Sequence, residues 1–333
     1  MRYKKFAALE EPVSQLGLGC WGFSGSSVWD NSDDERTIRV IREAIDRGVN
    51  FIDVAPVYGK GHSEEIVGRV LKEGLRQKVL LATKCGLVWK GEEDARNNLK
   101  RESIFREVED SLKRLQTDVI DIYQLHWPDP DTELEETIGA IEELKKQGKI
   151  RYFGMTNFSL SDIRRANTIT TVNTVQGLYN MLEQNPTAYH NIPLEYRTRD
   201  EILPYCQEKD IPFLPYSPLF QGLLTGTFRE NNNFSDRDVR NANPKLVGPA
   251  YSDFYKIVER LKNLAAEWGH PLNEVAINWL AKQKMVGPII AGATNVEQFC
   301  SNCQAMEWEL NQEQFDILEN TISEMDSALT KIK

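Results

Sequence analysis

Residues 48–68 read GVNFIDVAPVYGKGHSEEIVG, and three patterns follow one another within them. The run NFIDVA (50–55) is short and almost wholly apolar, as expected of a strand that is buried on both faces of a sheet. A loop with two glycines comes next, and an amphipathic pattern over Ser63–Lys72 then predicts a helix. The stretch therefore predicts one strand–loop–helix unit of a parallel α/β fold.

Similar units lie on both sides of this stretch, so that we expect eight strands separated by helices. The strand-like runs are VSQLGLGCW (13–21), NFIDVA (50–55), VLLATK (79–84), VIDIYQLHW (119–127), YFGMTN (152–157), TVQGLYN (174–180), PFLPYS (212–217) and GPIIAG (287–292). The predicted helices are Glu35–Arg47, Ser63–Lys72, Arg101–Leu115, Glu133–Gln147, Asp162–Ala166 and onward, Arg199–Glu208, Phe254–Trp268 and Glu274–Lys282, the last with Asn273 as its N-cap.

This alternation favours an α/β fold of the (β/α)8 type, a TIM barrel, over an open doubly wound sheet. Periodicity alone leaves the open sheet as an alternative. Against it, the first strand–helix connection lacks the G-x-G-x-x-G pattern that opens a dinucleotide-binding sheet. We find no linker that divides the chain, so residues 1–333 are predicted to form a single domain.

Two segments depart from the alternation. Leu219–Asp253 is rich in asparagine and has no helical period, which predicts a long loop after strand 7, on the face where barrel active sites form. Asn311–Lys333 is predicted to form one C-terminal helix outside the barrel.

Composition excludes several classes of protein. The 333 residues include 40 basic and 50 acidic side chains, a net charge of −10 without a basic face, which argues against a nucleic-acid partner. No apolar run reaches the roughly 18 residues of a membrane span, and the N-terminus lacks the apolar segment of a signal peptide. The five scattered cysteines are expected to be reduced thiols, so we expect a cytoplasmic protein.

Charged residues stand in two of the apolar runs. Asp53 lies inside FIDVA and Lys84 ends VLLATK. An unpaired buried charge costs several kcal/mol, so each residue needs a partner, and neighbouring barrel strands would supply one to the other. Two interpretations stay open: an ion pair that fixes the strand register, or part of a functional site.

Two further residues belong to the same predicted face. Tyr58 lies in the loop after the second strand, and a nearby ammonium would lower its pKa towards the working range of a general acid. His126 ends the fourth run; alone it would be interpreted as a core histidine, but here it is the fourth polar group on one face.

The four histidines lack metal-ligand spacing, so no metal site is predicted. The Cys300 and Cys303 pair is expected to pack against the barrel.

Together these residues resemble the signature of the aldo-keto reductase superfamily. The similarity continues through GMTNF (154–158), Gln176, YSPL-x-x-GLLTG (216–226) and AGATNVEQFCSN (291–302), and it is greatest to bacterial reductases related to potassium-channel β subunits. The resemblance implies a barrel that binds a nicotinamide cofactor without a separate Rossmann domain. It also implies reduction of an aldehyde, ketone or sugar carbonyl in a small-molecule substrate.

The resemblance assigns a role to each matching residue. Tyr58 would donate the proton to the carbonyl oxygen, Lys84 and Asp53 would tune it, and His126 would orient the carbonyl. The residues matched to cofactor binding are Thr156, Asn157 and Gln176 at the nicotinamide carboxamide, Tyr216 beneath the nicotinamide ring, Ser217, Leu219 and Gly222 at the pyrophosphate and ribose, and Gly292, Thr294, Gln298 and Asn302 at the adenosine.

One departure from the family pattern concerns the choice of cofactor. Many members place a basic residue after the glycine of the last motif, where it meets the 2′-phosphate of NADP, whereas Ala293, Thr294 and Asn295 are neutral. We expect NADP as the cofactor, with NAD close behind it. Three arginines of the long loop are candidates to replace the missing charge: Arg229, Arg237 and Arg240.

Other functions remain open at this point. A regulatory module that binds the cofactor and turns over slowly is the alternative to an enzyme, although all four predicted catalytic residues are present. A barrel hydrolase or lyase would need a metal or paired-carboxylate site that the sequence does not offer. Trp21, Trp89 and Trp127 are expected in the walls of the substrate pocket.

Overall fold

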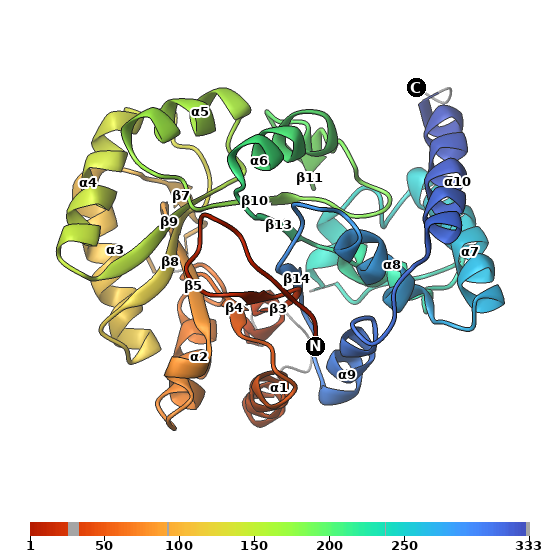
Figure 1. Cartoon of the computed structure of the whole chain (residues 1–333), viewed down its shortest axis with the longest axis horizontal. Helices are drawn as coiled ribbons and strands as arrows, with labels where there is room; N and C mark the ends of the chain where they lie inside the picture. Colours follow the sequence, from red (N-terminus) through yellow and green to blue (C-terminus); the bar gives the residue numbers. More distant parts are fainter. Residues whose placement is uncertain (26–32, 92, 237, 331–333) are drawn as a thin grey trace.

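A computed structural model of the chain has a barrel of eight parallel strands with helices around it (Figure 1). It describes residues 1–25, 33–91, 93–236 and 238–330. In chain order the barrel strands are β3 (Leu16–Gly19), β4 (Phe51–Asp53), β5 (Leu80–Cys85), β8 (Ile120–Leu125), β9 (Ile150–Thr156), β10 (Thr174–Leu178), β13 (Phe213–Tyr216) and β14 (Ile289–Ala291).

The strands pair in the order β13-β10-β9-β8-β5-β4-β3-β14. The barrel closes where β13 meets the segment that leads into β14. There the Phe213 N–H donates to the Met285 carbonyl over 2.8 Å, and the Gly287 N–H donates to the Phe213 carbonyl over 3.0 Å. The predicted fold class, a (β/α)8 barrel, is therefore confirmed, and the open doubly wound sheet is excluded.

Each predicted strand run overlaps one barrel strand, although β5 and β9 extend beyond their predicted runs and the first predicted run is too long. Only Leu16–Gly19 enters the barrel; the preceding β2 (Val13–Ser14) pairs antiparallel with β1 (Tyr3–Lys4). Two further small hairpins were not predicted because their strands have only two residues each, too few for an alternating pattern. They are β6 (Leu87–Val88) with β7 (Arg96–Asn97), and β11 (Ala188–Tyr189) with β12 (Ile192–Pro193).

Helices cover the outside of the barrel (Figure 1). They are α1 (Asp34–Asp46), α2 (His62–Leu71), α3 (Arg101–Leu115), α4 (Leu134–Lys146), α5 (Leu160–Ile169), α6 (Leu203–Lys209), α7 (Pro249–Glu267), α8 (Leu272–Ala281), α9 (Val296–Gln304) and α10 (Gln312–Thr330), with shorter helical turns η1 (Trp21–Phe23), η2 (Arg76–Lys78), η3 (Thr198–Ile202), η4 (Phe220–Thr225) and η5 (Val239–Ala242). The prediction of Asn273 as an N-cap is wrong. Helix α8 starts after Pro271, and the Asn273 amide nitrogen instead donates to Ser301 Oγ and Asn302 Oδ1.

The long loop after β13 is shorter and more ordered than predicted. Helix α7 begins at Pro249 rather than at Phe254, because Gly248, with φ +76°, turns the chain and a proline can occupy the first helical turn. The turns η4 and η5 lie within the remaining segment. The loop therefore has defined local structure on both sides of residue 237, which lies outside the described residues.

The C-terminal helix lies outside the barrel, as predicted. In Figure 1, α10 lies alongside α7, on the side of the molecule remote from α4. Phe315 stacks on Trp279 of α8, and the Trp279 Nε1–H donates to Glu319 over 2.8 Å. Among the described residues, no helix combines the length and the apolar character that a membrane crossing requires.

Candidate active site

The four predicted catalytic residues meet at the carboxyl ends of three neighbouring strands. Asp53 is the last residue of β4, Lys84 lies near the end of β5, and His126 directly follows β8. Tyr58 lies in the loop between β4 and α2. Because β4, β5 and β8 are adjacent parallel strands, their carboxyl ends point to the same face of the barrel.

Lys84 lies at the centre of this group. Its side chain is 0% exposed, and its Nζ lies 2.8 Å from Asp53 Oδ2, 3.0 Å from the Val54 carbonyl oxygen and 3.3 Å from the Tyr58 hydroxyl. These three acceptors match the three hydrogens of an ammonium group. The ion pair predicted from the sequence is thus present, and it lies in contact with the phenol.

Two glutamines complete the surroundings of Asp53. Its Oδ1 accepts a hydrogen bond from Gln176 over 2.9 Å and another from Gln124 over 3.3 Å. Sequence reasoning missed Gln124, although a signal was present: it precedes His126 by two residues on β8, and residues at that spacing share one side of a strand. Lys84 and the two glutamines therefore provide donors to both oxygens of Asp53.

The predicted direction of the Tyr58 pKa is wrong. Burial, reinforced by the charge of Asp53 and by Cys20, raises the pKa of the Tyr58 phenol well above its ordinary value. Burial and the negative charge of Asp53 outweigh the Lys84 ammonium, so the pKa rises instead of falling. Tyr58 is consequently a protonated phenol at neutral pH, which is the form that can give up a proton.

His126 is held beside Tyr58 as a neutral ring. Burial and the nearby charge of Lys84 lower the pKa of His126 well below its ordinary value. Its ring meets that of Tyr58 edge-on, with centroids 6.0 Å apart and planes at 81°. A neutral imidazole carries one N–H donor, so His126 can donate a hydrogen bond without adding a charge.

The residues predicted at the nicotinamide lie on or directly after β9, β10 and β13. Asn157 Oδ1 accepts from the Tyr216 hydroxyl over 2.9 Å and from the Tyr196 hydroxyl over 3.1 Å, while its Nδ2 donates to the His126 carbonyl over 3.2 Å. Sequence reasoning missed Tyr196, which lies in an irregular segment. These bonds link the predicted nicotinamide residues directly to the group around Lys84.

Thr156 and Gln176 differ in whether their side chains have a hydrogen-bond partner. The Thr156 Oγ1 is buried and has no hydrogen-bond partner in the described part of the chain. Gln176, by contrast, turns its amide nitrogen towards Asp53. An unpartnered buried hydroxyl is costly, so Thr156 is a position where a bound molecule would satisfy a polar atom.

The loop after β13 has a backbone shape that few sequences allow. Ser217, Phe220, Gln221 and Gly222 all have positive φ values. At Gly222, with φ +102°, an added Cβ would lie 3.3 Å from the Phe228 ring. Glycine is therefore needed at this position, both for the conformation and for space.

The loop continues from Ser217 through Leu219, and both of these predicted residues are half-buried. Arg240 lies near this loop, with Nη1 3.9 Å from where a Cβ of Gly222 would lie. Its Nε donates to Asp238 over 2.9 Å, and its guanidinium faces the Phe234 ring. Arg229 is exposed.

Of the four residues predicted at the adenosine, Gly292 and Thr294 precede α9, and Gln298 and Asn302 lie on it. The Thr294 N–H and hydroxyl donate to Gln298 Oε1 over 2.9 and 3.0 Å, and Asn302 Nδ2 donates to the Gly292 carbonyl over 3.5 Å. Asn295 caps α9 by accepting from the Gln298 N–H. The structure thus brings the predicted residues together without any basic side chain in the run 292–295.

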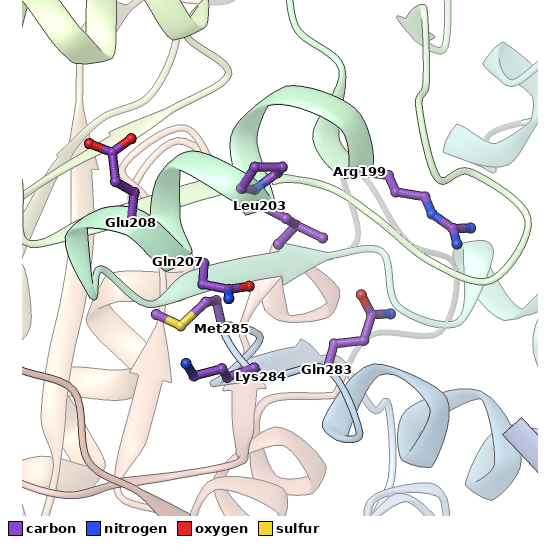
Figure 2. A pocket seen from close by; sticks show the side chains of 8 residues that line it. Arg199, Leu203, Gln207, Glu208, Gln283, Lys284 and Met285 are labelled. Atoms are coloured by element: carbon purple, nitrogen blue, oxygen red, sulfur yellow. The ribbon is translucent and has the colours of Figure 1, made fainter. Parts of the chain in front are cut away.

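A separate cavity lies away from this face. It measures about 580 Å³ and lies between α6 and the segment before β14 (Figure 2). Its lining is Arg199, Leu203, Pro204, Gln207, Glu208, Gln283, Lys284 and Met285. All of these residues precede β13 or β14, and none belongs to the predicted site.

The sequence also led to predictions about three tryptophans, the cysteines and metal binding. Trp21, Trp89 and Trp127 are each half-buried. All five cysteines are free thiols; on α9, Cys303 is buried and Cys300 is half-buried, with its Sγ 3.7 Å from Glu43. Within the described ranges, no three His, Cys, Asp or Glu side chains gather in a way that could hold a metal ion.

Comparison with known proteins identifies the family. Residues 15–323 match the family model described as Aldo/keto reductase family. Aldo-keto reductase YhdN of Bacillus subtilis is 38% identical over 97% of this chain and 96% of its own length. The NADH-specific methylglyoxal reductase of Escherichia coli is 35% identical over 90% of this chain and 91% of its own. A probable voltage-gated potassium channel subunit beta of Oryza sativa is 31% identical over 92% of each.

Solved structures agree with this result. The glycerol dehydrogenase AKR11B4 from Gluconobacter oxydans superposes with a TM-score of 0.84 at 33% identity, covering 97% of this chain and 95% of that one. An aldo/keto reductase from Klebsiella pneumoniae, solved with NADP and acetate, has a TM-score of 0.69 at 27% identity, covering 93% and 92%. The chain therefore belongs to the aldo-keto reductase family, the oxidoreductases that act on carbonyl groups of small molecules.

Proposed function

We propose that this protein is an NADP(H)-dependent reductase of aldehyde, ketone or sugar carbonyls, and that Tyr58 is its proton donor. The observation that carries the proposal is the position of Lys84 Nζ, 2.8 Å from Asp53 and 3.3 Å from the Tyr58 hydroxyl, at the carboxyl ends of the barrel strands. A phenol that stays protonated at neutral pH has the proton that reduction of a carbonyl consumes.

Each residue of the group has a distinct task in this proposal. Tyr58 transfers its proton to the carbonyl oxygen as negative charge develops there. The Lys84 ammonium, already in contact with the hydroxyl, then stabilises the phenolate that remains, and Asp53 keeps Lys84 in place. The neutral His126 ring donates a hydrogen bond to the same carbonyl oxygen and so orients the substrate.

The residues present fit a nicotinamide cofactor. Thr156 offers an unpartnered buried hydroxyl, and Tyr216 presents a ring whose hydroxyl is fixed by Asn157. The loop from Ser217 to Gly222 offers backbone N–H groups in the left-handed conformations that suit phosphate binding. When bound, the nicotinamide supplies the hydride, and the protein supplies position and electrostatics.

The neutral stretch Ala293-Thr294-Asn295 leads us to expect that both NADPH and NADH are accepted. A charge-assisted bond is roughly twice as strong as a neutral one, so its absence weakens NADPH binding on the order of tenfold. The relatives support both cofactors, since one is named for NADH and another was solved with NADP. Dissociation constants for the two cofactors measure the preference directly.

Two sets of variants make this measurement decisive. Thr294 is exposed, so Thr294→Arg restores the missing charge and is expected to raise the preference for NADPH about tenfold. Separate Arg229→Ala, Arg237→Ala and Arg240→Ala variants test whether a loop arginine replaces it. A preference for NADPH of several hundredfold that persists in all three alanine variants would show that the phosphate site is misplaced.

A regulatory, cofactor-binding module is the second candidate, because a potassium-channel β subunit is among the relatives. Turnover distinguishes the two functions. We expect the absorbance of the reduced cofactor to fall when aldehydes are added from a panel. Cofactor binding without turnover on any carbonyl would favour the regulatory module.

The five free thiols support the proposal of a reducing, cytoplasmic compartment.

A further inference from the structure

The β11–β12 hairpin after β10 contacts the loop after β13 through a chain of hydrogen bonds. His190, in the turn of the hairpin, lies 2.7 Å through its Nε2 from Gln221 Nε2. Gln221 Oε1 accepts from Asn243 Nδ2 over 2.9 Å. Asn243 Oδ1 in turn accepts from the backbone N–H of Lys245 over 3.1 Å. Two segments far apart in the sequence are thereby tied together.

The last contact in this series, from the Lys245 backbone N–H, fixes which atom donates and which accepts in each of the other hydrogen bonds. A backbone N–H can only donate, so Asn243 must accept with its oxygen and donate with its nitrogen. Gln221 then accepts from Asn243, and its own nitrogen must donate to His190. His190 Nε2 is therefore an acceptor, which requires the neutral ring with its proton on Nδ1. Protonated His190 would present a second donor to Gln221, and the chain would lose a hydrogen bond.

Other contacts join the segment after β10, which includes the hairpin, to the loop after β13. Lys245 Nζ pairs with Glu183 over 2.6 Å, and Asn180 Nδ2 donates to the Ser217 carbonyl over 3.1 Å. Tyr189 meets the ring of Tyr216 edge-on, with centroids 5.4 Å apart. The hairpin thus contacts the loop after β13 at two points, at Tyr216 where the loop begins and at Gln221 within it.

We propose that His190 is a positioning residue for the nucleotide-binding loop, holding it through Gln221 in the neutral form and releasing it when protonated. This rests on the proposed function, in which the Ser217–Gly222 loop binds the pyrophosphate. The consequence is that the cofactor binds more tightly above the pKa of His190 than below it.

The groups that face His190 favour the neutral ring. From its own hairpin Tyr189 stacks on it, with centroids 4.4 Å apart, and from the loop after β13 the Lys245 ammonium lies nearby, paired with Glu183. Burial is the main cause that lowers the pKa of His190 below its ordinary value, and the nearby Lys245 charge adds to it. A hydrogen bond with Gln221 would raise this pKa if the amide oxygen faced the ring, but the contacts of Asn243 turn the amide nitrogen towards it. The hydrogen bond between His190 and Gln221 is therefore present at pH 7 and above, and it is lost as the pH falls through the lowered pKa of His190.

Binding of NADP⁺ between pH 8 and pH 5 tests the proposal with two variants that change the chain in opposite ways. His190→Gln keeps an amide oxygen as the acceptor and removes the titration. Gln221→Glu offers only oxygens, which still accept from Asn243 but require a donor at position 190, so that protonated His190 becomes the better partner. Expressing each dissociation constant relative to wild type at the same pH cancels the titration of the ligand.

We expect wild type to bind about fivefold more weakly at pH 5 than His190→Gln does, the cost of one neutral hydrogen bond. Gln221→Glu is expected to show the reverse trend, improving relative to wild type as the pH falls. His270→Gln, a control at a histidine that stacks on Trp308 instead, should follow wild type. Parallel pH profiles for wild type, His190→Gln and Gln221→Glu would overturn the proposal. Failure of wild type to bind NADP⁺ or NAD⁺ at any pH would overturn the proposed function itself.

Discussion

Replacement of Tyr58 by phenylalanine is expected to lower kcat for carbonyl reduction by about 10²–10⁴-fold, the usual contribution of a general acid. The phenol is the group that contacts Lys84 Nζ and carries a proton at neutral pH. Its loss leaves the carbonyl oxygen without a proton donor as the hydride arrives. Cofactor binding should change only a few-fold, because Tyr58 is not among the residues that we place around the nucleotide.

The measurement is steady-state reduction of an accepted aldehyde, together with cofactor titration by fluorescence. Tyr196→Phe is a matched control: it removes a buried hydroxyl that supports Asn157 and leaves Tyr58 intact. We expect this control to weaken cofactor binding more than it lowers kcat. A Tyr58→Phe enzyme that retains a rate within a few-fold of wild type would refute the assignment of the proton donor.

The meeting of Asp53 and Lys84 could be predicted because it follows from two general rules. A charged residue in an apolar run needs a partner, and the carboxyl ends of adjacent parallel strands lie on one face. Both rules depend only on sequence order and pattern. The 2.8 Å ion pair is what they require once the barrel is assumed.

Contacts made by irregular segments could not be predicted in this way. Tyr196 reaches Asn157 from a segment without period, and His190 lies in a hairpin whose strands have two residues each. Asn273 has the residue type of an N-cap, but tertiary contacts to Ser301 and Asn302 use its side chain instead. In each case the packing of distant segments decides the outcome, and no local pattern records it.

The direction of the Tyr58 pKa was mispredicted for a different physical reason. The expectation took account of the charge of the Lys84 ammonium and left out the burial of the hydroxyl. Burial of the hydroxyl and the negative charge of Asp53, which lies in contact with the ammonium, together outweigh the effect of Lys84 on the phenol. In the proposed mechanism, Tyr58 therefore keeps its proton at neutral pH until negative charge develops on the carbonyl oxygen of the substrate.

Substitution of Lys84 by methionine is expected to have two separable effects. The first concerns stability: Asp53 is only 2% exposed, and removing its partner leaves a buried carboxylate without a counter-ion, which costs about 3–5 kcal/mol of unfolding free energy. The second concerns catalysis, because the phenolate formed during reduction loses the ammonium that lies 3.3 Å from its oxygen. Activity should fall, and the pH profile of alcohol oxidation, which needs the phenolate, should move to higher pH.

The double variant Asp53→Asn with Lys84→Met distinguishes the two effects. Removing both charges leaves no unpaired buried ion, so much of the lost stability should return in urea unfolding. Activity should not return, because the ammonium beside Tyr58 is still missing. If instead the double variant recovered both the rate and the wild-type pH profile, the pair would serve only to fix β4 against β5. That result would leave Tyr58 without its partner in the proposed mechanism, whereas recovery of stability alone assigns the catalytic task to the Lys84 cation.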